Sequence, residues 1–87
     1  MEFEWDAAKA AHNLAKHGID FPQATRIFDD PNIRRGIDPR PRGEVRYRAI
    51  GSVNGMVLFV CYTMRGEICR IISARRASRR ERRAYSL

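Results

Sequence analysis

The sequence predicts an α+β fold in a single domain of residues 1–87. Two N-terminal helices are expected to pack on a meandering antiparallel sheet, with a basic helix at the C-terminus. Three observations lead to this prediction. Residues that start and stop helices frame two stretches before residue 31. Residues 44–74 alternate apolar and polar side chains between short glycine turns, which is typical of a β-meander. Ser78 and Glu81 have the spacing of a capping box at the start of an arginine-rich helix.

The first helix is expected over Ala7–His17, after a short edge strand at Phe3–Trp5. Asp6 is a favoured N-cap because its carboxylate can accept a hydrogen bond from an N–H of the first turn. Gly18 suits the left-handed conformation that ends a helix. Leu14 is the one large apolar residue of this alanine-rich segment.

The second helix is shorter and starts near Pro22, because proline is favoured at the first helical position. Asp29-Asp30-Pro31 ends it, and its apolar face consists of Ala24, Ile27 and Phe28. Residues 32–43 then contain prolines, glycines and four arginines. We interpret this stretch as a basic loop without fixed structure, with at most a short strand at Ile33.

Three strands follow, at residues 44–53, 56–64 and 67–74. Asn54-Gly55 is the strongest hairpin signal, because both residues tolerate the positive φ of a type I′ turn. With this turn, one face of the hairpin is apolar and can be covered by the N-terminal helices; it carries Val45, Tyr47, Ala49, Leu58, Val60 and Tyr62. The polar face carries Arg46, Arg48, Cys61 and Thr63.

The second turn, at Arg65-Gly66, leaves two registers open. A two-residue loop pairs Arg70 with Cys61 and places Arg70 with the arginines of the polar face. A three-residue loop with a glycine bulge shifts the register by one residue and moves Arg70 under the helices. We prefer the first register because it avoids burying Arg70, and it points Cys61 and Cys69 to opposite faces.

Positive charge is concentrated in the second part of the chain. The whole chain has 17 Lys and Arg against 10 Asp and Glu, a net charge of +7. Residues 1–31 hold three basic and six acidic side chains, a net charge of −3. Residues 32–87 hold fourteen arginines and four acidic side chains, a net charge of +10. This asymmetry is typical of a protein that binds a polyanion, most often nucleic acid, although an acidic protein partner also fits.

Several classes of protein are not expected. No apolar run reaches the length of a transmembrane helix, and the acidic N-terminus does not resemble a signal peptide, so we expect a cytoplasmic protein with reduced cysteines. His12 and His17 are five residues apart, which is not the spacing of a zinc-binding helix. No Cys/His set has metal-ligand spacing, so neither a metal site nor a cofactor is expected.

The stretch Arg70–Arg83 contains seven arginines in fourteen residues. An arginine-rich helix can serve solubility alone. Arg75 and Arg76, however, lie where a strand meets a helix, and packing on both sides should fix their side chains. The planar fork of arginine matches phosphate oxygens in a bidentate way, so this stretch favours phosphate binding.

Motifs along nearly the whole chain resemble the BrnT toxin family. They are Phe3-x-Trp5-Asp6, Lys9, Asn13, Lys16-His17-Gly18-Ile19, Phe21, Phe28-Asp29-Asp30-Pro31, Arg46-Tyr47-x-Ala49-Ile50-Gly51, Tyr62-Thr63 and, most specific, Arg70-Ile71-Ile72-Ser73-Ala74-Arg75-Arg76-Ala77 with Glu81-Arg82. Residues 32–43 are unmatched and richer in arginine than the family pattern. Met64 also departs from it, since an acidic residue is expected there.

The resemblance implies a RelE-like fold and a ribonuclease toxin of a type II toxin–antitoxin system that cleaves RNA and inhibits translation. It also implies a cognate antitoxin with a ribbon-helix-helix DNA-binding part. Operator DNA would then be bound only through the antitoxin, and the pair would repress its own operon. The residues alone leave an alternative, which is a non-enzymatic nucleic-acid-binding or ribosome-associated protein.

RNA cleavage by 2′-hydroxyl attack needs a base, an acid and cations around the phosphorane. Arginine is a natural clamp for that charge, so the catalytic candidates are Arg75 first, then Arg46 and Arg70. The base stays open: His17 has a suitable intrinsic pKa but also suits the C-terminal end of its helix, and Glu44 is a carboxylate candidate. The RNA-binding candidates are Arg48, Arg76, Arg79, Arg80, Lys9 and Lys16.

Overall fold

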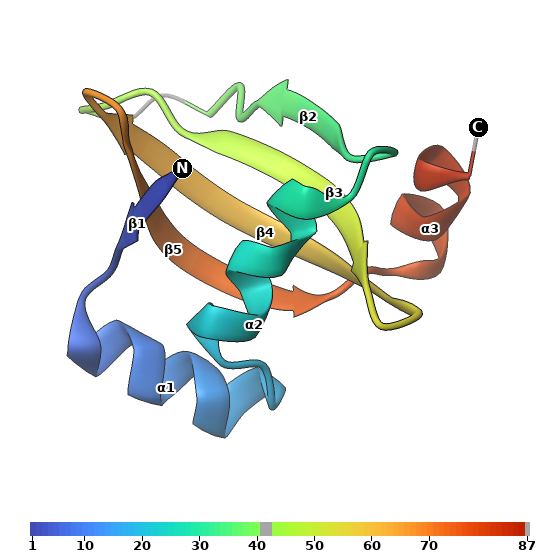
Figure 1. The fold of residues 1–87 in the computed structure, drawn as a ribbon, viewed down its shortest axis with the longest axis horizontal. Helices are drawn as coiled ribbons and strands as arrows, with labels where there is room; N and C mark the ends of the chain where they lie inside the picture. The colour runs from blue at the N-terminus through green and yellow to red at the C-terminus, as the bar shows by residue number, and fades with distance from the viewer. Residues whose placement is uncertain (41–42, 87) are drawn as a thin grey trace.

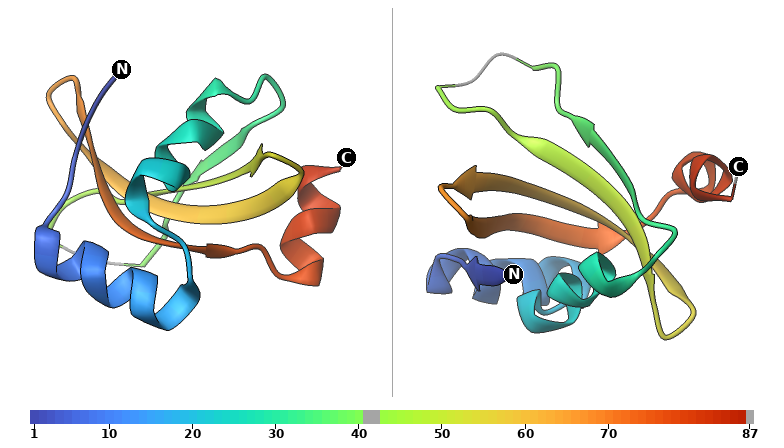
Figure 2. Two further views of the ribbon diagram at one scale, coloured as in Figure 1. Left: turned by 60° about the horizontal axis from the view of Figure 1, so that its bottom comes forward. Right: turned by 45° about the horizontal axis from the view of Figure 1, so that its top comes forward.

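A computed structural model describes residues 1–40 and 43–86 of the chain. Its elements are β1 (Glu2–Glu4), α1 (Ala7–His17), α2 (Phe21–Thr25), the 3₁₀ helix η1 (Arg26–Asp29), β2 (Arg34–Ile37), β3 (Tyr47–Val53), β4 (Met56–Arg65), β5 (Ile68–Arg76) and α3 (Arg79–Tyr85). The strands form one sheet in the order β1-β5-β4-β3-β2, in which only β1 and β5 run parallel. The helices α1 and α2 cover one face, and α3 lies beyond the sheet's other side (Figures 1 and 2). The predicted α+β architecture is confirmed.

The caps of α1 are as predicted. The Asp6 carboxylate accepts a hydrogen bond from the Lys9 N–H at 2.9 Å, and Gly18 ends the helix with a φ of 72°. The side chain that α1 buries is an unexpected one, because Leu14 is 50% exposed whereas Asn13 is 5% exposed. Asn13 donates to the carbonyl of Ala74 at 2.8 Å and accepts from its N–H at 3.0 Å. It therefore provides hydrogen bonds to the outward N–H and C=O groups of Ala74, in the part of β5 that β1 does not reach.

The helix α2 and η1 together form the second helical stretch, ending at Asp29 as expected. Ile27 is fully buried, and η1 packs directly on β3: a Cβ added at Gly51 would lie 2.7 Å from the Cβ of Ile27. Only glycine allows this close approach of helix and strand. The core between the helices and the sheet contains Ile19, Phe21, Ala24, Ile27, Ala49, Val53, Leu58, Val60, Tyr62, Cys69, Ile71 and Ala74. No helix in the described ranges is long and apolar enough to cross a membrane.

The strand β2 corrects the prediction of an unstructured loop over residues 32–43. Its residues Arg34–Ile37 pair antiparallel with β3, and Ile33 lies just before the strand. All four residues of β2 are exposed, so the segment lacks the apolar alternation that identifies a half-buried strand. The strand forms because its backbone pairs with β3, a contact that the local sequence does not reveal. The residues Pro41 and Arg42 of the predicted loop lie outside the described residues.

The β3–β4 hairpin has the predicted register, with Val53 opposite Met56 and Tyr47 opposite Tyr62. Asn54 and Gly55 have φ values of 51° and 79°, as a type I′ turn requires. The strand β3 begins at Tyr47 rather than at residue 44, so Val45 precedes the sheet and is exposed instead of joining the core.

The β4–β5 turn is at Gly66-Glu67 rather than at Arg65-Gly66, which is a correction to the predicted turn. Gly66 takes the positive φ of 61° at the first turn position, and Arg70 therefore pairs with Thr63 and not with Cys61. A shift of two residues preserves the faces, so Arg70 stays on the polar side as predicted. Cys69 is buried under the helices and Cys61 lies on the other face, which confirms their predicted opposition.

Candidate nucleic-acid interface

The sheet face opposite α1 and α2, which we call the outer face, gathers arginines from three strands. The register places Arg34, Ile50, Phe59 and Arg75 in one row across β2, β3, β4 and β5. The neighbouring row contains Gly36, Arg48, Cys61 and Ser73. Because side chains two residues apart share a face, Arg34 and Arg48 lie on the same side as Arg75.

A groove of about 440 Å³ opens between the outer face and α3, and we call it the arginine groove. Its apolar lining comes from Ile50, Phe59 and Ala84, and its one acidic residue is Glu81. The other lining residues are Arg34, Arg35, Gly36, Arg48 and Arg80. A cationic groove with an aromatic ring in its wall is the combination that binds single-stranded nucleic acid, since cations hold phosphates and the ring stacks on a base.

Arg75 is fixed beside this groove by an aromatic ring and a carboxylate. Its guanidinium carbon lies 4.3 Å from the centre of the Phe59 ring. Its two terminal nitrogens donate to the two oxygens of Glu81 at 2.7 and 2.9 Å. These bonds raise the pKa of Arg75 and hold the pKa of Glu81 below its ordinary value. The prediction that packing fixes Arg75 at the strand–helix junction agrees with this arrangement.

The Arg75 side chain still has donors available for a ligand. Its side chain is 40% exposed. In the described part of the chain, Glu81 and the carbonyl of Arg76 occupy three of its five N–H groups. The remaining N–H groups can donate to phosphate oxygens. The ion pair with Glu81 therefore positions the guanidinium and still leaves donors for a ligand.

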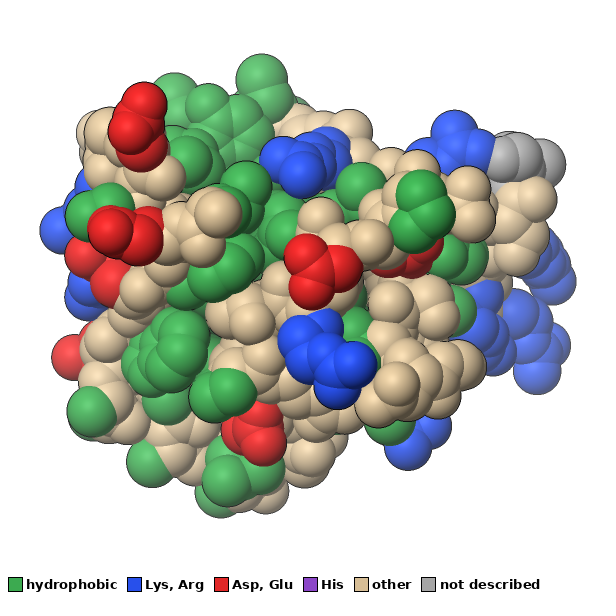
Figure 3. All heavy atoms as spheres, in the orientation of Figure 1, with side chains coloured by type: hydrophobic (Ala, Val, Ile, Leu, Met, Phe, Trp, Pro, Cys, Tyr) green, Lys and Arg blue, Asp and Glu red, His purple; other side chains and the backbone are tan. Residues whose placement is uncertain are grey.

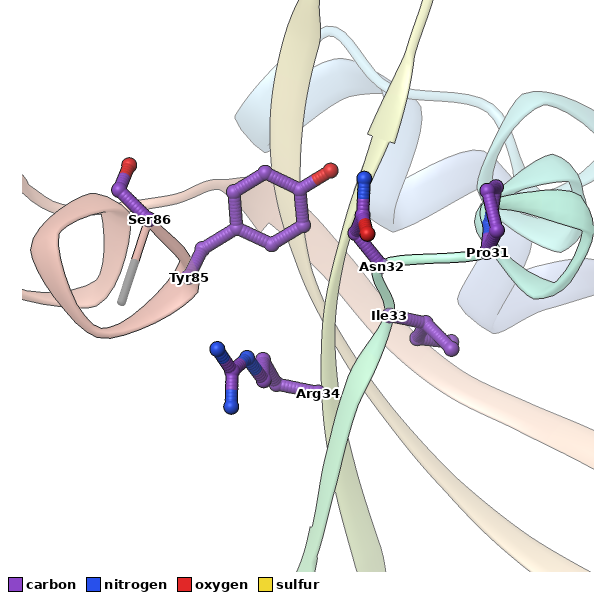
Figure 4. Close-up of a pocket in the computed structure, with 6 residues that line it drawn as sticks. All are labelled: Pro31, Asn32, Ile33, Arg34, Tyr85 and Ser86. Atoms are coloured by element: carbon purple, nitrogen blue, oxygen red, sulfur yellow. The ribbon is translucent and has the colours of Figure 1, made fainter.

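The helix α3 is anchored by its last residue as well as by its cap. The Tyr85 hydroxyl donates to the Asp30 carboxylate at 2.5 Å, and Asp30 also accepts the Ser52 N–H at 2.7 Å. The bond from Tyr85 lowers the pKa of Asp30, and the same bond raises the pKa of Tyr85. Figure 4 shows Tyr85 reaching from α3 toward Asn32 at the edge of a surface pocket. This tie holds Arg80 and Glu81 against the outer face.

A second, smaller set of charges lies toward the other end of the outer face. Asp38 is buried and accepts side-chain hydrogen bonds from Arg40: the Nε donates to both carboxylate oxygens at 3.0 and 3.2 Å, and the Nη2 donates to one of them at 2.7 Å. These bonds, supported by the charge of Arg48, hold the pKa of Asp38 far below its ordinary value.

None of the five predicted catalytic residues lines the arginine groove: Arg75 lies beside it, His17 lies on α1, and Arg70, Arg46 and Glu44 lie elsewhere. Arg70 forms an ion pair with Glu4 at 2.8 Å across the β1–β5 pairing. Arg46 precedes β3, and within the described residues its buried Nε has no hydrogen-bond partner. Glu44 is exposed, and its carboxylate lies 3.8 Å from the Arg65 guanidinium. The structure therefore gathers Arg48, Arg75 and Arg80 but separates them from these three residues.

The predicted helix residues form a separate groove, which we call the α1 groove. It is lined by Ala8, Lys9, His12, Asn13, Lys16, His17, Ile72 and Ser73. His17 is thus grouped with both predicted lysines and with His12, which had been considered only as a metal ligand. Ser73 also belongs to an outer-face row, so the α1 groove adjoins the outer face along β5.

Arg76 and Arg79 are exposed near the start of α3 and do not line the arginine groove. Sequence reasoning missed Arg34, Phe59 and the second role of Glu81. The signal for Glu81 was present, since the capping-box carboxylate comes six residues after Arg75. Phe59 could not be placed opposite Arg75 from the sequence, because a bulge at Cys61/Tyr62 shifts the β4–β5 register between the turn and Phe59.

One family of known proteins matches the chain. The family is described as "Ribonuclease toxin, BrnT, of type II toxin-antitoxin system", and its model covers residues 5–81. The match includes all residues of the arginine groove except Ala84. None of the curated proteins compared with the chain matches it.

Proposed function

The chain belongs to the BrnT family of ribonuclease toxins of type II toxin–antitoxin systems, and on this premise we propose that it cleaves single-stranded RNA at the arginine groove and so inhibits translation. The observation that carries this proposal is the guanidinium of Arg75, held between Phe59 and Glu81 beside a groove rimmed by further arginines. This arrangement offers a preorganised cation, an aromatic surface and several phosphate ligands at one place.

The proposed reaction is attack by the 2′-hydroxyl on the adjacent phosphorus, which forms a 2′,3′-cyclic phosphate as the bond to the 5′-oxygen breaks. The 2′ proton passes to a base, and the leaving 5′-oxygen takes a proton from water. Arg75 stabilises the negative charge that develops on the phosphorane, because its position is fixed before the substrate arrives. Arg48 and Arg80 hold the flanking phosphates, and the exposed Arg76 and Arg79 extend the positive surface. The arginines supply the positive charge in this scheme, which therefore proceeds without a metal ion.

The first candidate for the proton acceptor is His17, which lies in the α1 groove with Lys9 and Lys16, on the helix side of the sheet and away from Arg75. It can serve only a 2′-hydroxyl that reaches past Ser73, where the α1 groove meets the outer face. Glu44 is the second candidate, while Arg46 and Arg70 are proposed to contact RNA beyond the arginine groove.

The biological setting is part of the same proposal. A ribonuclease toxin requires an antitoxin partner and has RNA as its substrate. We propose that the antitoxin carries a ribbon-helix-helix part, that operator DNA is bound only through it, and that the pair represses its own operon in the cytoplasm.

Expression without the antitoxin tests the proposal. Induction of the wild-type chain should arrest growth and remove full-length messenger RNA within minutes. The purified chain should cleave single-stranded RNA in the presence of a metal chelator. RNA binding without cleavage, together with unchanged growth, would instead show a non-enzymatic nucleic-acid-binding protein.

A further inference from the structure

Exposed apolar side chains gather at one end of the sheet, beyond the cover of the helices. The large ones in the described ranges include Ile37, which is 63% exposed, with Met1, Val45 and Met64. A groove of about 420 Å³ is lined by Met1, Arg35, Gly36, Ile37, Tyr47, Tyr62 and Met64, and we call it the apolar groove. Figure 3 shows hydrophobic side chains clustered on this side of the molecule, where β2 and the β4–β5 turn lie in Figure 1. Clusters of this kind mark protein-binding surfaces.

The apolar groove borders an open strand edge. The strand β2 is last in the sheet order, and within residues 1–40 and 43–86 it pairs with β3 alone. The Asp38 N–H donates to the Arg46 carbonyl at 2.8 Å, which continues this pairing by one step. Since main-chain groups alternate in an antiparallel pair, Arg34 and Gly36 face β3, whereas the N–H and C=O groups of Arg35 and Ile37 face outward. These outward groups can pair with one more strand.

We propose, on the premise of the toxin function, that the antitoxin adds an extended segment to β2 and places its apolar side chains in the apolar groove. Strand addition of this kind takes affinity from main-chain hydrogen bonds and specificity from alternate side chains. The occupant is expected to alternate apolar and acidic residues. Its acidic side chains face Arg34, which is exposed on the outer face of β2, and its apolar side chains lie on the opposite face with Ile37 and Arg35. The guanidinium carbon of Arg35 lies 5.1 Å from the centre of the Phe28 ring on that face.

Charge favours an acidic partner over a second copy of the chain. Pairing of two β2 strands would bring Arg34 and Arg35 of one chain against the same residues of the other, and like charges across a strand pair are destabilising. Both chains would also carry a net charge of +7. An acidic segment instead neutralises the arginines of β2 when it docks.

This docking site also accounts for silencing of the toxin. Arg34 and Gly36 of β2 line the arginine groove, while Ile37 lines the apolar groove. A segment seated on β2 therefore lies between the two grooves. Its flanking residues can cover the arginines proposed to bind RNA, so antitoxin and RNA compete.

The test uses the antitoxin encoded in the same operon and two variants of one residue. Ile37→Asp removes the apolar contact, and Ile37→Pro removes an outward N–H without removing a bond to β3. Each should weaken antitoxin binding by about tenfold or more, on the scale of an interface anchor, with the RNA cleavage rate unchanged. Leu14→Asp is the matched control, because Leu14 is 50% exposed on α1 and lies outside the apolar groove. It should bind antitoxin as the wild type does.

Three outcomes would overturn the proposal: wild-type antitoxin affinity in both Ile37 variants, an equal loss of affinity in Leu14→Asp, or a dimer of the chain alone that Ile37→Asp dissociates. Thermal unfolding checks that each variant is folded. Failure of the ribonuclease function would be seen separately, as a wild-type chain that binds the antitoxin but cleaves no RNA.

Discussion

Replacement of Arg75 by alanine removes a guanidinium that makes one ring contact and three hydrogen bonds, one of them to the Arg76 carbonyl at 3.2 Å. The guanidinium stacks on Phe59 at 4.3 Å and bonds both oxygens of Glu81 at 2.7 and 2.9 Å. After the substitution, Glu81 still accepts the Ser78 N–H at 2.8 Å and retains its place in the capping box. The helix α3 therefore keeps its start, and the variant should fold.

The two consequences of this change differ in size. The Arg75 side chain is 40% exposed, so water screens its ion pair, and loss of the pair and the ring contact should cost about 1 kcal/mol of unfolding free energy. The cleavage rate should fall much further, by about a hundredfold, as when one preorganised donor is lost from a transition state. That factor corresponds to about 2.7 kcal/mol of activation free energy.

Single-turnover cleavage of a labelled single-stranded RNA measures the rate, and titration of a 2′-O-methyl RNA that cannot react measures the affinity. The affinity should fall far less than the rate, because the other arginines remain. Arg83→Ala is the matched control, since Arg83 is exposed and lies outside the arginine groove. It should leave the single-turnover rate nearly unchanged. A folded Arg75→Ala variant that cleaves at the wild-type rate would refute the catalytic role of Arg75.

Further predictions address charge, the cysteines, the core and pH. RNA affinity should fall by about 0.7 log units per log unit of salt for each phosphate neutralised, and a flat plot would contradict phosphate binding. A thiol reagent should modify Cys61 in the folded chain but not Cys69, whose pKa burial raises to about 11, and mild oxidation should form no bond between them. Asn13→Ala should lower the unfolding free energy by about 1–3 kcal/mol, measured in denaturant, because the backbone of Ala74 loses both partners. The pKa of Glu81 is depressed by Arg75, so its stabilising effect should be present above the ordinary value of 4.5 and be lost as pH falls through the lower folded value; Glu81→Gln should flatten that part of the stability curve.

The elements predicted correctly are those determined by short-range rules. Asp6 and Gly18 delimit α1, and Asn54-Gly55 sets the hairpin register, because each acts within a few residues. The strand β2 escaped prediction because its order comes from pairing with β3, which local composition does not reveal.

The candidate site was predictable in part for the same reason. The position of Arg75 at a strand–helix junction indicated a fixed guanidinium, and the capping spacing identified Glu81 as a residue of the first turn. Their mutual bond depends on how α3 folds back against the sheet, which a single sequence does not specify. The separation of His17 from the arginine groove is likewise a matter of tertiary packing, since α1 lies along β5 on the other side of the sheet.

The most direct test of the central claim is to map where RNA binds. Titration of the isotope-labelled chain with a 2′-O-methyl RNA, followed by nuclear magnetic resonance, reports each residue separately. We predict that the backbone amide signals of Arg48, Phe59 and Glu81 shift progressively as RNA is added. The amide signal of Ala24, which is buried between the helices and the sheet, should not shift. Shifts confined to His17 and its neighbours in the α1 groove, with the signals of the outer face unchanged, would contradict the account.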